Sequence, residues 1–514
     1  MYDLIDIGTL RVADGFFLAS TESMTPMPLR APRGNTVFTR PGMEASLRDA
    51  LYDLVDSATR KLFVCSFLLD DQGLIERLCR KADQLRGGVY VVTAIKDEWL
   101  TKAFADPDEA QLKPTKHLIE PLVAAGAQVR GCESAHAKFA VADDREVIIS
   151  TANFDQRGLL HTGEAGVRLS SPDEVLRLSR FFSRLWLSRS ELEMPHDPSD
   201  RFTVRNTKRP AHPPVVPAAD ATIPGRVIWT DGKEHQIAET IARTADAAMR
   251  ELVVCTYDVR GLDRLTDLVV APFDRAVQRG VRVRLLTRIR NPRRSTRESL
   301  RILAAIGVEI RGDSTNHAKF IIADRKCGAL FSANLDAEHG ITSGIEVGVT
   351  VNGDDAGSLC GYFDEAFHDH RSAPFVDRPT HGDIDRQLRA RFRRPWASDQ
   401  ALTVQCDRKT WESFRESVTR GEPVLYQSSD DKLSLIASSE TFEVNSSTST
   451  MTHLPRGKGV TAGRSSGQLL DQWMSARDGE DAVRGIFSGG IQRTSEVNSV
   501  LASATEQKQP TSRH

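Results

Sequence analysis

Two short segments of the chain carry the same reactive side chains at the same spacing. In each, a lysine follows a histidine by 2 residues, an aspartate follows the lysine by 5, and an asparagine follows the aspartate by 10. A histidine can act as a nucleophile or transfer protons, a lysine neutralises anionic oxygens, and an asparagine amide donates hydrogen bonds to developing charge. Two such sets could supply a nucleophile, an acid and cations for attack on a negatively charged centre. The residues are His136, Lys138, Asp143 and Asn153 in the first segment and His317, Lys319, Asp324 and Asn334 in the second.

The similarity extends beyond these motifs and indicates an internal duplication. Residues 122–143, aligned without a gap on residues 303–324, are identical at 11 of 22 positions. Two copies of one lobe explain the pattern most simply. Two further pairs of similar runs lie upstream: KLFVCSFLL (61–69) with ELVVCTYDV (251–259), and GVYVVTAI (88–95) with GVRVRLLT (280–287).

Each copy alternates helical and extended patterns. Residues 44–60 carry apolar side chains at helical spacing, and residues 62–69 form a short apolar run that is typical of a buried strand. Alternating βα units followed by further strands predict an α/β fold, with a mixed, mainly parallel sheet covered by helices in each lobe. The first copy further predicts helices 74–86, 116–125 and 173–188 and strands 89–95, 127–130, 138–142, 147–151 and 165–169, and the second repeats this order from 234 to about 370.

The repeat divides the chain into five regions. A segment with five prolines separates the two copies and reads as an extended linker. The two ends of the chain have no counterpart in the repeat. The C-terminal part is rich in Ser, Thr and Gly, so we expect it to be partly disordered and to offer a site for a protein partner. The predicted regions are an N-terminal extension 1–37, a first lobe 38–204, the linker 205–224, a second lobe 225–374 and a C-terminal extension 375–514.

Composition restricts the classes of protein and of site. The formal net charge is −2, which excludes a wholesale electrostatic attraction to nucleic acid but not a local one. The seven cysteines are scattered without a C-x-x-C pair, so we expect no metal site, no disulfide framework and no cofactor. The first residues lack the positive charge of a signal peptide, and no apolar stretch approaches the roughly 20 residues of a membrane span. These features predict a cytoplasmic protein without an integral membrane segment.

The doubled H-x-K-x4-D motif, each followed by an asparagine, resembles the phospholipase D superfamily and, in general character, its nuclease-like bacterial members. In this superfamily two such motifs, one from each half of a pseudo-symmetric molecule, build one active site. The resemblance implies two α/β/α lobes related by a pseudo-twofold axis and a reaction at a phosphodiester. It also implies that one chain completes the site, so that an oligomer is not required.

The resemblance assigns roles to the motif residues. It implies His136 as the nucleophile that forms a phosphohistidine and His317 as the general acid, while the pseudo-symmetry leaves the reverse assignment open. Lysines and asparagines would stabilise the phosphate oxygens, whereas the motif aspartates Asp143 and Asp324 would hold structure. The histidine pair would titrate as a coupled unit.

Neighbouring residues fit the same pattern. Glu164 and Glu346, 11 and 12 residues after the two asparagines, match the carboxylates that orient the histidines in this superfamily. Thr151 and Ser332 keep a hydroxyl close to each asparagine, and we expect them to contact the substrate. Phe331 departs from the superfamily, which commonly has glycine there.

An arginine cluster follows the strand that begins at Gly280. The loop beyond this strand is expected near the catalytic rim, and clustered arginines suit extended polyanions because each phosphate contact adds affinity and fixes register. The alternative is a solvated helix face. The candidate substrate-binding residues are Arg288, Arg290, Arg293 and Arg294.

Three functions from different classes are compatible with these residues. The preferred one is a metal-independent nuclease that cleaves DNA or RNA, in a bacterial defence or repair setting, because of the arginine cluster and the lack of a membrane span. The second is a phospholipase D or cardiolipin-synthase-like phosphatidyltransferase acting on phospholipid, which would favour membrane spans or exposed apolar loops. The third is a non-catalytic nucleic-acid-binding module, against which the intact motifs in both halves argue.

Overall fold

The chain forms two compact units in the computed structural model. One consists of residues 22–289 and 302–372 and contains both copies of the repeat; the other consists of residues 1–21, 290–301 and 373–514. The structure describes residues 15–18, 31–41, 46–95, 116–195, 204–207, 225–290, 293–369, 372–379, 409, 413, 424–429, 432–437, 440–445 and 450–454.

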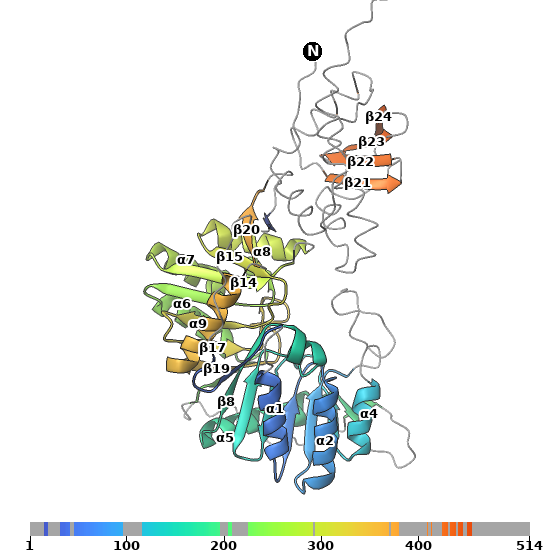
Figure 1. Cartoon of the computed structure of the whole chain (residues 1–514), viewed down its shortest axis with the longest axis vertical. Coiled ribbons are helices and arrows are strands. Elements are labelled where there is room, and N and C mark those ends of the chain that lie inside the picture. The colour runs from blue at the N-terminus through green and yellow to red at the C-terminus, as the bar shows by residue number, and fades with distance from the viewer. Residues whose placement is uncertain are drawn as a thin grey trace, which may run out of the picture. The chain divides into compact units, whose positions relative to one another are not determined.

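The first lobe is built on one large sheet (Figure 1). Its strands are β2 (Thr36–Thr39), β3 (Leu62–Cys65), β4 (Val89–Thr93), β5 (Gln128–Gly131), β6 (Phe139–Ala142), β7 (Glu146–Ser150), β8 (Glu164–Leu169), β9 (Leu192–Met194) and β10 (Arg205–Asn206). Their order in the sheet is β10-β9-β5-β4-β3-β6-β7-β8-β2. Only the start of the predicted linker, at β10, lies within the described residues.

The second lobe repeats this arrangement. Its strands are β11 (Val227–Thr230), β12 (Glu251–Cys255), β14 (Arg282–Arg288), β15 (Glu309–Asp313), β16 (Phe320–Ala323), β17 (Cys327–Phe331) and β19 (Glu346–Asn352), with β13 (Val259–Arg260) and β18 (Leu335–Asp336) forming a separate short pair. The order β15-β14-β12-β16-β17-β19-β11 matches that of the first sheet.

Antiparallel pairing predominates, which corrects the expectation of mainly parallel sheets. Among the described strands of the two large sheets, β3-β4, β4-β5, β12-β14 and β14-β15 are parallel. The strands that follow in each copy pair antiparallel with their neighbours. Short connections such as the turn between β6 and β7 cannot cross over to a parallel neighbour. The mixed α/β class is therefore confirmed, but antiparallel strand pairs outnumber parallel ones in the described sheets.

Helices lie where the sequence predicts them. In the first lobe, Leu47, Leu51 and Leu78 from two of these helices pack with strand residues in one buried apolar cluster. Such burial of apolar area stabilises each lobe by roughly 25 cal/mol per Å². The helices are α1 (Ser46–Ser57), α2 (Gln72–Gln84), α4 (Lys116–Ala124), α5 (Pro172–Arg184), α6 (Gln236–Ala247), α7 (Ala271–Gln278), α8 (Arg294–Ala305) and α9 (Gly353–Phe367), with shorter helical turns at Arg157–His161, Leu185–Arg189, Leu262–Arg264 and Thr266–Val270.

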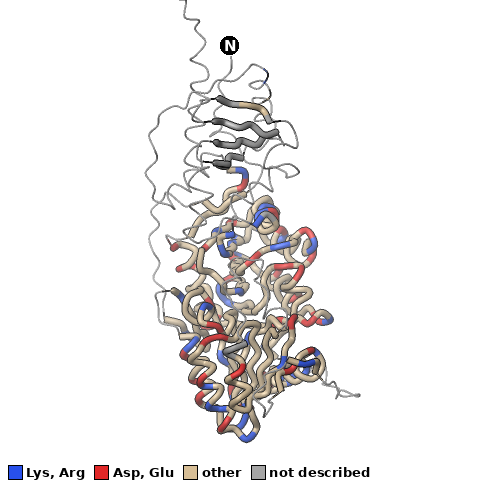
Figure 2. Tube along the Cα trace, turned by 90° about the vertical axis from the view of Figure 1, so that its right-hand side faces the viewer, with Lys and Arg blue, Asp and Glu red and all other residues tan. Residues whose placement is uncertain are grey.

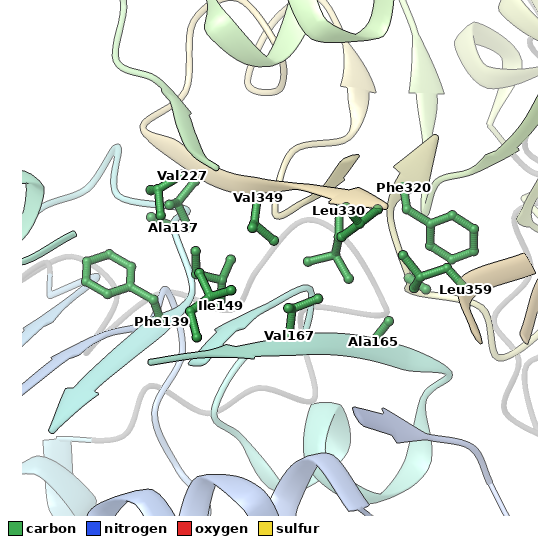
Figure 3. Close-up of a cluster of buried hydrophobic side chains, with 14 of the residues drawn as sticks. Ala137, Phe139, Ile149, Ala165, Val167, Val227, Phe320, Leu330, Val349 and Leu359 are labelled. Atoms are coloured by element: carbon green, nitrogen blue, oxygen red, sulfur yellow. The ribbon is translucent and has the colours of Figure 1, made fainter. Parts of the chain in front are cut away.

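The two lobes share one buried core. Figure 3 shows Ile149 and Val167 of the first sheet facing Leu330 and Val349 of the second. Side chains from α5 and α9 belong to the same cluster, and nearly all of its members are fully buried. Because apolar contacts join the sheets across the repeat, the placement of one lobe against the other is set by the core.

Strand registers show which residues of the two copies correspond. β3 and β4 pair Leu62 with Val89, and β12 and β14 pair Leu252 with Val283. Since the two leucines correspond, so do the two valines. The sequence alignment of GVYVVTAI with GVRVRLLT is therefore wrong by two residues. The corrected register makes Ala94 the counterpart of Arg288.

The other unit contains β1 (Gly15–Phe17), which pairs antiparallel with β20 (Ala373–Asp377). It also contains a four-stranded antiparallel sheet, β21 (Val424–Ser429), β22 (Lys432–Ala437), β23 (Glu440–Asn445) and β24 (Thr450–Leu454). The Ser- and Thr-rich composition of this extension did not predict the sheet. Across the described residues of both units, none of the helices is long and apolar enough to cross a membrane.

Candidate active site

The histidine and lysine of each motif lie just before a central antiparallel strand. Lys138 directly precedes β6, and its ammonium donates to the carbonyl oxygen of His136 at 2.5 Å. Lys319 directly precedes β16 and donates to the carbonyl oxygen of His317 at 2.5 Å. Both lysines are fully buried. Buried ammonium groups are unfavourable unless anionic groups lie close, so these lysines mark a site that suits an anionic ligand.

Backbone hydrogen bonds between the lobes bring the motifs together. The His136 N–H donates to the Ile345 carbonyl at 2.9 Å, and the Ile345 N–H donates to the Ser134 carbonyl at 3.0 Å. Each motif is thereby fastened to the residue that precedes the glutamate of the other lobe. The equivalent bonds in the other half, both 2.8 Å, run from the His317 N–H to the Gly163 carbonyl and from the Gly163 N–H to the Thr315 carbonyl.

The two glutamates orient the histidines of the opposite lobes. Nδ1 of His136 lies 3.1 Å from Oε1 of Glu346, and Nδ1 of His317 lies 2.5 Å from Oε1 of Glu164. A carboxylate on Nδ1 sets the orientation of the ring and leaves Nε2 available for reaction. We call His136, Lys138 and Glu346 the first half-site, and His317, Lys319 and Glu164 the second. The structure thus brings the predicted residues together but exchanges the glutamates between the lobes.

The hydroxyls that we expected at the substrate bind these glutamates instead. Thr151 Oγ1 donates to Oε2 of Glu164 at 2.5 Å, and Ser332 Oγ donates to Oε2 of Glu346. Both hydroxyl residues are fully buried. That Thr151 and Ser332 contact the substrate stays a prediction, and in the free protein both hydroxyls are bound to the glutamates. Their physical role is to satisfy carboxylates whose burial would otherwise be costly.

Burial and neighbouring charges set the protonation of the site. Burial lowers the pKa of His136, and Lys138 lowers it further against the opposing effect of Glu346. The pKa of His317 lies well below its ordinary value because of burial and the charges of Lys319 and Lys138. Burial also lowers the pKa of Lys319, to about 7. Burial and the neighbouring lysines therefore favour the neutral form of both imidazoles in the free protein.

The two asparagines keep an unused hydrogen-bonding group. Asn153 and Asn334 are half-buried, and the side-chain amide oxygen of each is buried without a hydrogen-bond partner. A buried polar atom without a partner costs roughly 1–3 kcal/mol. Both unpartnered atoms are acceptors, so a phosphate, which also accepts, would be bound through the amide nitrogens of these side chains.

Two aromatic side chains that we had not singled out pack on the histidines. The ring centroid of Phe67 lies 4.7 Å from that of His136, and the centroid of Tyr257 lies 4.3 Å from that of His317. Phe67 and Tyr257 occupy equivalent positions in the runs 61–69 and 251–259, so the repeat alignment contained the signal. Each ring covers one side of an imidazole and contributes to its burial.

Comparison with known families decides the relationship. A family model described as "Cardiolipin synthase, PLD-like domain" matches residues 51–186 and 241–370, which together make up just over half of the chain. The chain belongs to the phospholipase D superfamily. Each matched segment contains one complete motif and its downstream glutamate, and membership indicates action at a phosphodiester. No curated protein matches the chain.

Solved structures similar to this phospholipase D-like chain share little sequence with it. Phosphatidylserine synthase from Haemophilus influenzae Rd KW20 is 13% identical, with a TM-score of 0.45 over 75% of this chain and 96% of that one. Nuc, a phospholipase D family member from Salmonella typhimurium, is 19% identical, with a TM-score of 0.25 over 29% and 96%. Polyphosphate kinase from Porphyromonas gingivalis is 14% identical, with a TM-score of 0.40 over 64% and 48%. These similarities indicate no substrate.

The aspartates of the phospholipase D motifs hold turns in both lobes. Asp143 and Asp324 have positive φ angles of 57° and 50°, which non-glycine residues rarely adopt. Asp143 accepts backbone N–H groups of Thr59, Arg60 and Lys61, and Asp324 accepts those of Met249, Arg250 and Glu251. Each carboxylate thus fastens the turn after a motif strand to the start of β3 or β12.

The arginine cluster does not form one exposed patch. Arg288 ends β14, and its guanidinium carbon lies 5.4 Å from the ring centroid of Tyr257. Arg290, which belongs to the other unit, is only 6% exposed, and Arg293 is half-buried. The side chain of Arg294 lies outside the described residues. The burial of Arg290 shows that the four arginines do not line one exposed surface, and their contact with phosphates stays a prediction.

Acidic and basic residues are interspersed along the coloured parts of the lobes in Figure 2. This pattern agrees with the net charge of −2. Local cations at the site, rather than the charge of the whole chain, are therefore available to attract an anionic substrate. Within the described part of the chain, no group of three or more His, Cys, Asp or Glu side chains could hold a metal ion.

Proposed function

We propose that this chain is a metal-independent phosphodiesterase that works through a phosphohistidine intermediate. The observation that carries the proposal is the crossed pairing of two half-buried histidines with two buried glutamates, each beside a buried lysine. This arrangement offers two imidazole Nε2 atoms and two ammonium groups, and an asparagine follows each motif. Nucleophile, acid and charge neutralisation are thus all supplied by side chains.

The reaction proceeds in two displacements. Nε2 of His136 attacks phosphorus, the bond from phosphorus to the leaving oxygen breaks, and the protonated His317 gives its proton to that oxygen. His317, now neutral, takes a proton from water or an alcohol, whose oxygen attacks phosphorus and breaks the phosphorus–nitrogen bond to His136. Lys138 and Lys319 neutralise the non-bridging oxygens in both steps.

The pKa values bear on which histidine attacks. His317 has the more strongly lowered pKa, which suits a neutral nucleophile and favours the reverse assignment. The superfamily resemblance favours His136 as nucleophile, and a bound phosphate anion would raise the pKa of both rings. We retain His136 as the nucleophile, and the position of the covalent adduct tests this choice.

We propose a nucleic acid as the substrate. Arg288 lies on Tyr257, which itself packs on His317, so a guanidinium stands beside the second half-site where it can bind a neighbouring phosphate. The alternative, a phosphatidyltransferase, is favoured by the description of the matched family model. Parallel incubation with single-stranded DNA, duplex DNA, RNA and phosphatidylglycerol vesicles separates the two, with a His136→Ala/His317→Ala protein as the control for contaminants. Turnover of vesicles without cleavage of any nucleic acid would replace the nuclease by the lipid enzyme.

Activity is expected to survive removal of divalent ions, because histidines and lysines perform the work that two-metal nucleases assign to metal. Turnover would be measured in EDTA after extensive dialysis, and again after Mg²⁺, Mn²⁺ or Zn²⁺ is restored. The rate should be unchanged within error. Loss of turnover in EDTA and its return with one ion would refute the metal-independent mechanism.

The rate constant kcat/KM is expected to fall as the pH rises above about 7. Burial, aided by Lys138, lowers the pKa of Lys319 to about 7, so its ammonium is charged below that pH and neutral above it. Only the charged form can neutralise the phosphate. The loss should approach about tenfold per pH unit for the removal of one proton. A pH profile at constant ionic strength that stays flat from pH 7 to 9 would contradict this role.

Replacing Arg288 with alanine is expected to weaken nucleic-acid binding without changing base preference, because phosphate contacts carry no direct sequence information. One lost contact should lower the slope of log affinity against log salt by roughly 0.7–0.9. Arg282 is the matched control, since it begins the same strand, about 20 Å away, and pairs with Glu309. Equal effects of Arg288→Ala and Arg282→Ala would show that Arg288 makes no specific contact.

A further inference from the structure

We propose that Arg40 is a positioning residue that holds the His317–Glu164 pair across the two lobes. The inference rests on the proposed function only in calling that pair catalytic. Arg40 directly follows β2 and is 2% exposed. Thr39, the last residue of β2, lies opposite Glu164 of β8. Arg40 is the next residue in the chain and therefore lies close to the buried glutamate.

From the first lobe Arg40 reaches acidic residues of the second. Nη1 donates to Oδ2 of Asp313 at 3.1 Å, and Nη2 lies 2.6 Å from Oε2 of Glu365 and 3.9 Å from Oδ2 of Asp369. The guanidinium also lies over the ring of Tyr362, 5.3 Å from its centroid. Burying these charges costs desolvation free energy, and close pairing offsets the cost only in one geometry. The network therefore specifies an arrangement of the lobes more than it adds stability.

Asp313 transmits this restraint to the second half-site. Its Oδ1 accepts the backbone N–H of Thr315 at 2.6 Å and the Thr315 hydroxyl at 2.8 Å. The Thr315 carbonyl accepts the Gly163 N–H, and the Gly163 carbonyl accepts the His317 N–H, both at 2.8 Å. Gly163 directly precedes Glu164, so one series of bonds joins Arg40 to both members of the pair.

Only a glycine fits at position 163 without movement of this network. A Cβ atom there would come within 2.3 Å of the Tyr362 hydroxyl and 3.5 Å of Nη1 of Arg40. The backbone that connects Glu164 to His317 is thus packed directly against the guanidinium and the ring beneath it. A displacement of Arg40 is expected to move that backbone.

The first half-site offers an internal comparison with the charges exchanged. Asp231 occupies the position equivalent to Arg40, because Thr230 pairs with Glu346 across β11 and β19. Asp231 forms an ion pair with Arg184 of the first lobe, so an interlobe pair is present in both halves.

The two halves differ in what the ion pair reaches. Cys132 stands where the second lobe has Asp313, and its thiol contacts the Ser134 hydroxyl at 3.7 Å. Without a carboxylate at this position, the pair of Asp231 and Arg184 fastens the lobes but does not bind the turn before His136. Asp231→Asn is therefore a matched control, because it breaks an interlobe ion pair without removing a bond to the turn before His136.

Chemical modification of the free protein tests the proposal without a substrate. Diethyl pyrocarbonate would be applied to wild type, Arg40→Met, Arg40→Lys and Asp231→Asn, with rates at His317 and His136 followed by peptide mass spectrometry. We expect Arg40→Met to change the His317 rate relative to the His136 rate severalfold, Arg40→Lys to change it less, and Asp231→Asn to leave the ratio at the wild-type value. An unchanged ratio in folded Arg40→Met would overturn the proposal.

Cleavage rates on two substrates with different leaving groups provide a second test. Substitution of a residue with only a structural role would not slow one substrate more than the other. With His317 as the acid, Arg40→Met should slow cleavage of a dinucleotide, whose leaving group is an alkoxide, by about 10²-fold, as expected for misplacement near 1 Å. The first release of nitrophenolate from bis(4-nitrophenyl) phosphate should be slowed much less, because this leaving group needs no proton. Equal losses on both substrates with an unchanged modification ratio would overturn the role of Arg40.

Two further outcomes distinguish failure of the Arg40 proposal from a folding defect and from failure of the proposed function. If Arg40→Met does not fold, Thr315→Ala removes the hydroxyl bond to Asp313 while keeping every charge, and it should change the same modification ratio; no change would overturn the proposal. If the wild type cleaves neither substrate, the proposed function fails, whereas the modification ratio still decides whether Arg40 positions His317.

Discussion

His136→Ala is expected to abolish turnover of every substrate, by a factor on the order of 10⁴ or more, because the nucleophile is lost and water cannot use the same geometry. His317→Ala is expected to slow formation of the covalent intermediate as much on substrates with alkoxide leaving groups but considerably less on nitrophenyl esters, since only the proton donor would be missing from that step. The measurement is the rate of first release of the leaving group, before steady state, for each variant on a matched pair of such substrates.

The double variant sharpens this test. Residues that act as one unit show strongly non-additive losses, so His136→Ala/His317→Ala should be scarcely slower than His136→Ala alone. His161, on the surface turn Arg157–His161, provides a control histidine, and His161→Ala should retain wild-type activity. His136→Ala activity within about tenfold of wild type would exclude covalent catalysis by this residue.

Glu346→Gln and Glu164→Gln are expected to lower kcat by about 10²- to 10⁴-fold, because glutamine cannot hold the same imidazole tautomer on Nδ1. The crossed geometry predicts which histidine each change disables. Glu346→Gln should behave like His136→Ala and lose activity on both leaving groups, since Glu346 binds His136. Glu164→Gln should behave like His317→Ala and spare the first release of nitrophenolate from nitrophenyl esters, since Glu164 binds His317.

The leaving-group pattern distinguishes this geometry from pairing within each lobe. If Glu164→Gln lost activity on both substrates and Glu346→Gln spared the nitrophenyl ester, each glutamate would serve the histidine of its own lobe and the crossed arrangement would be wrong. Circular dichroism and thermal unfolding of both variants control for loss of the fold, because each carboxylate is fully buried.

Repetition made the duplication and the motif residues predictable. Side chains at fixed spacing, present twice, predicted which histidines, lysines and asparagines belong to the candidate site, and apolar periodicity located the helices and strands around them. These features are local in sequence, so they can be read without knowing how the lobes meet. The expected roles of Asp143 and Asp324 also depend on neighbours that are close in the fold of one lobe.

Properties that depend on contact between the lobes could not be predicted. The exchange of Glu164 and Glu346 follows from backbone bonds across the interface, and nothing in their spacing from Asn153 or Asn334 indicates it. The same holds for Thr151 and Ser332, whose hydroxyls are consumed by those carboxylates. The buried network around Arg40 also joins residues that are far apart in sequence.

Other errors came from reading strands in isolation. Apolar runs show that a strand is buried but not whether its neighbour is parallel, which is why the antiparallel majority was missed. The alignment of GVYVVTAI with GVRVRLLT matched glycines, whereas hydrogen-bond register places Val89 opposite Leu62 as Val283 is opposite Leu252. Because the sequence alignment was wrong by two residues, it did not show that the residue of the first lobe equivalent to Arg288 is uncharged.

Trapping of the covalent intermediate tests the central claim most directly. Wild type and His317→Ala would be mixed with a nitrophenyl phosphodiester, quenched at alkaline pH where phosphorus–nitrogen bonds survive, and mapped by peptide mass spectrometry. The mechanism predicts an adduct on His136 that accumulates in His317→Ala, because the water that releases it is no longer activated. An adduct on His317 in the wild type would reverse the roles of the two histidines and keep the reaction class. Turnover without an adduct on either histidine, under conditions where His136→Ala is inactive, would contradict the phosphohistidine mechanism.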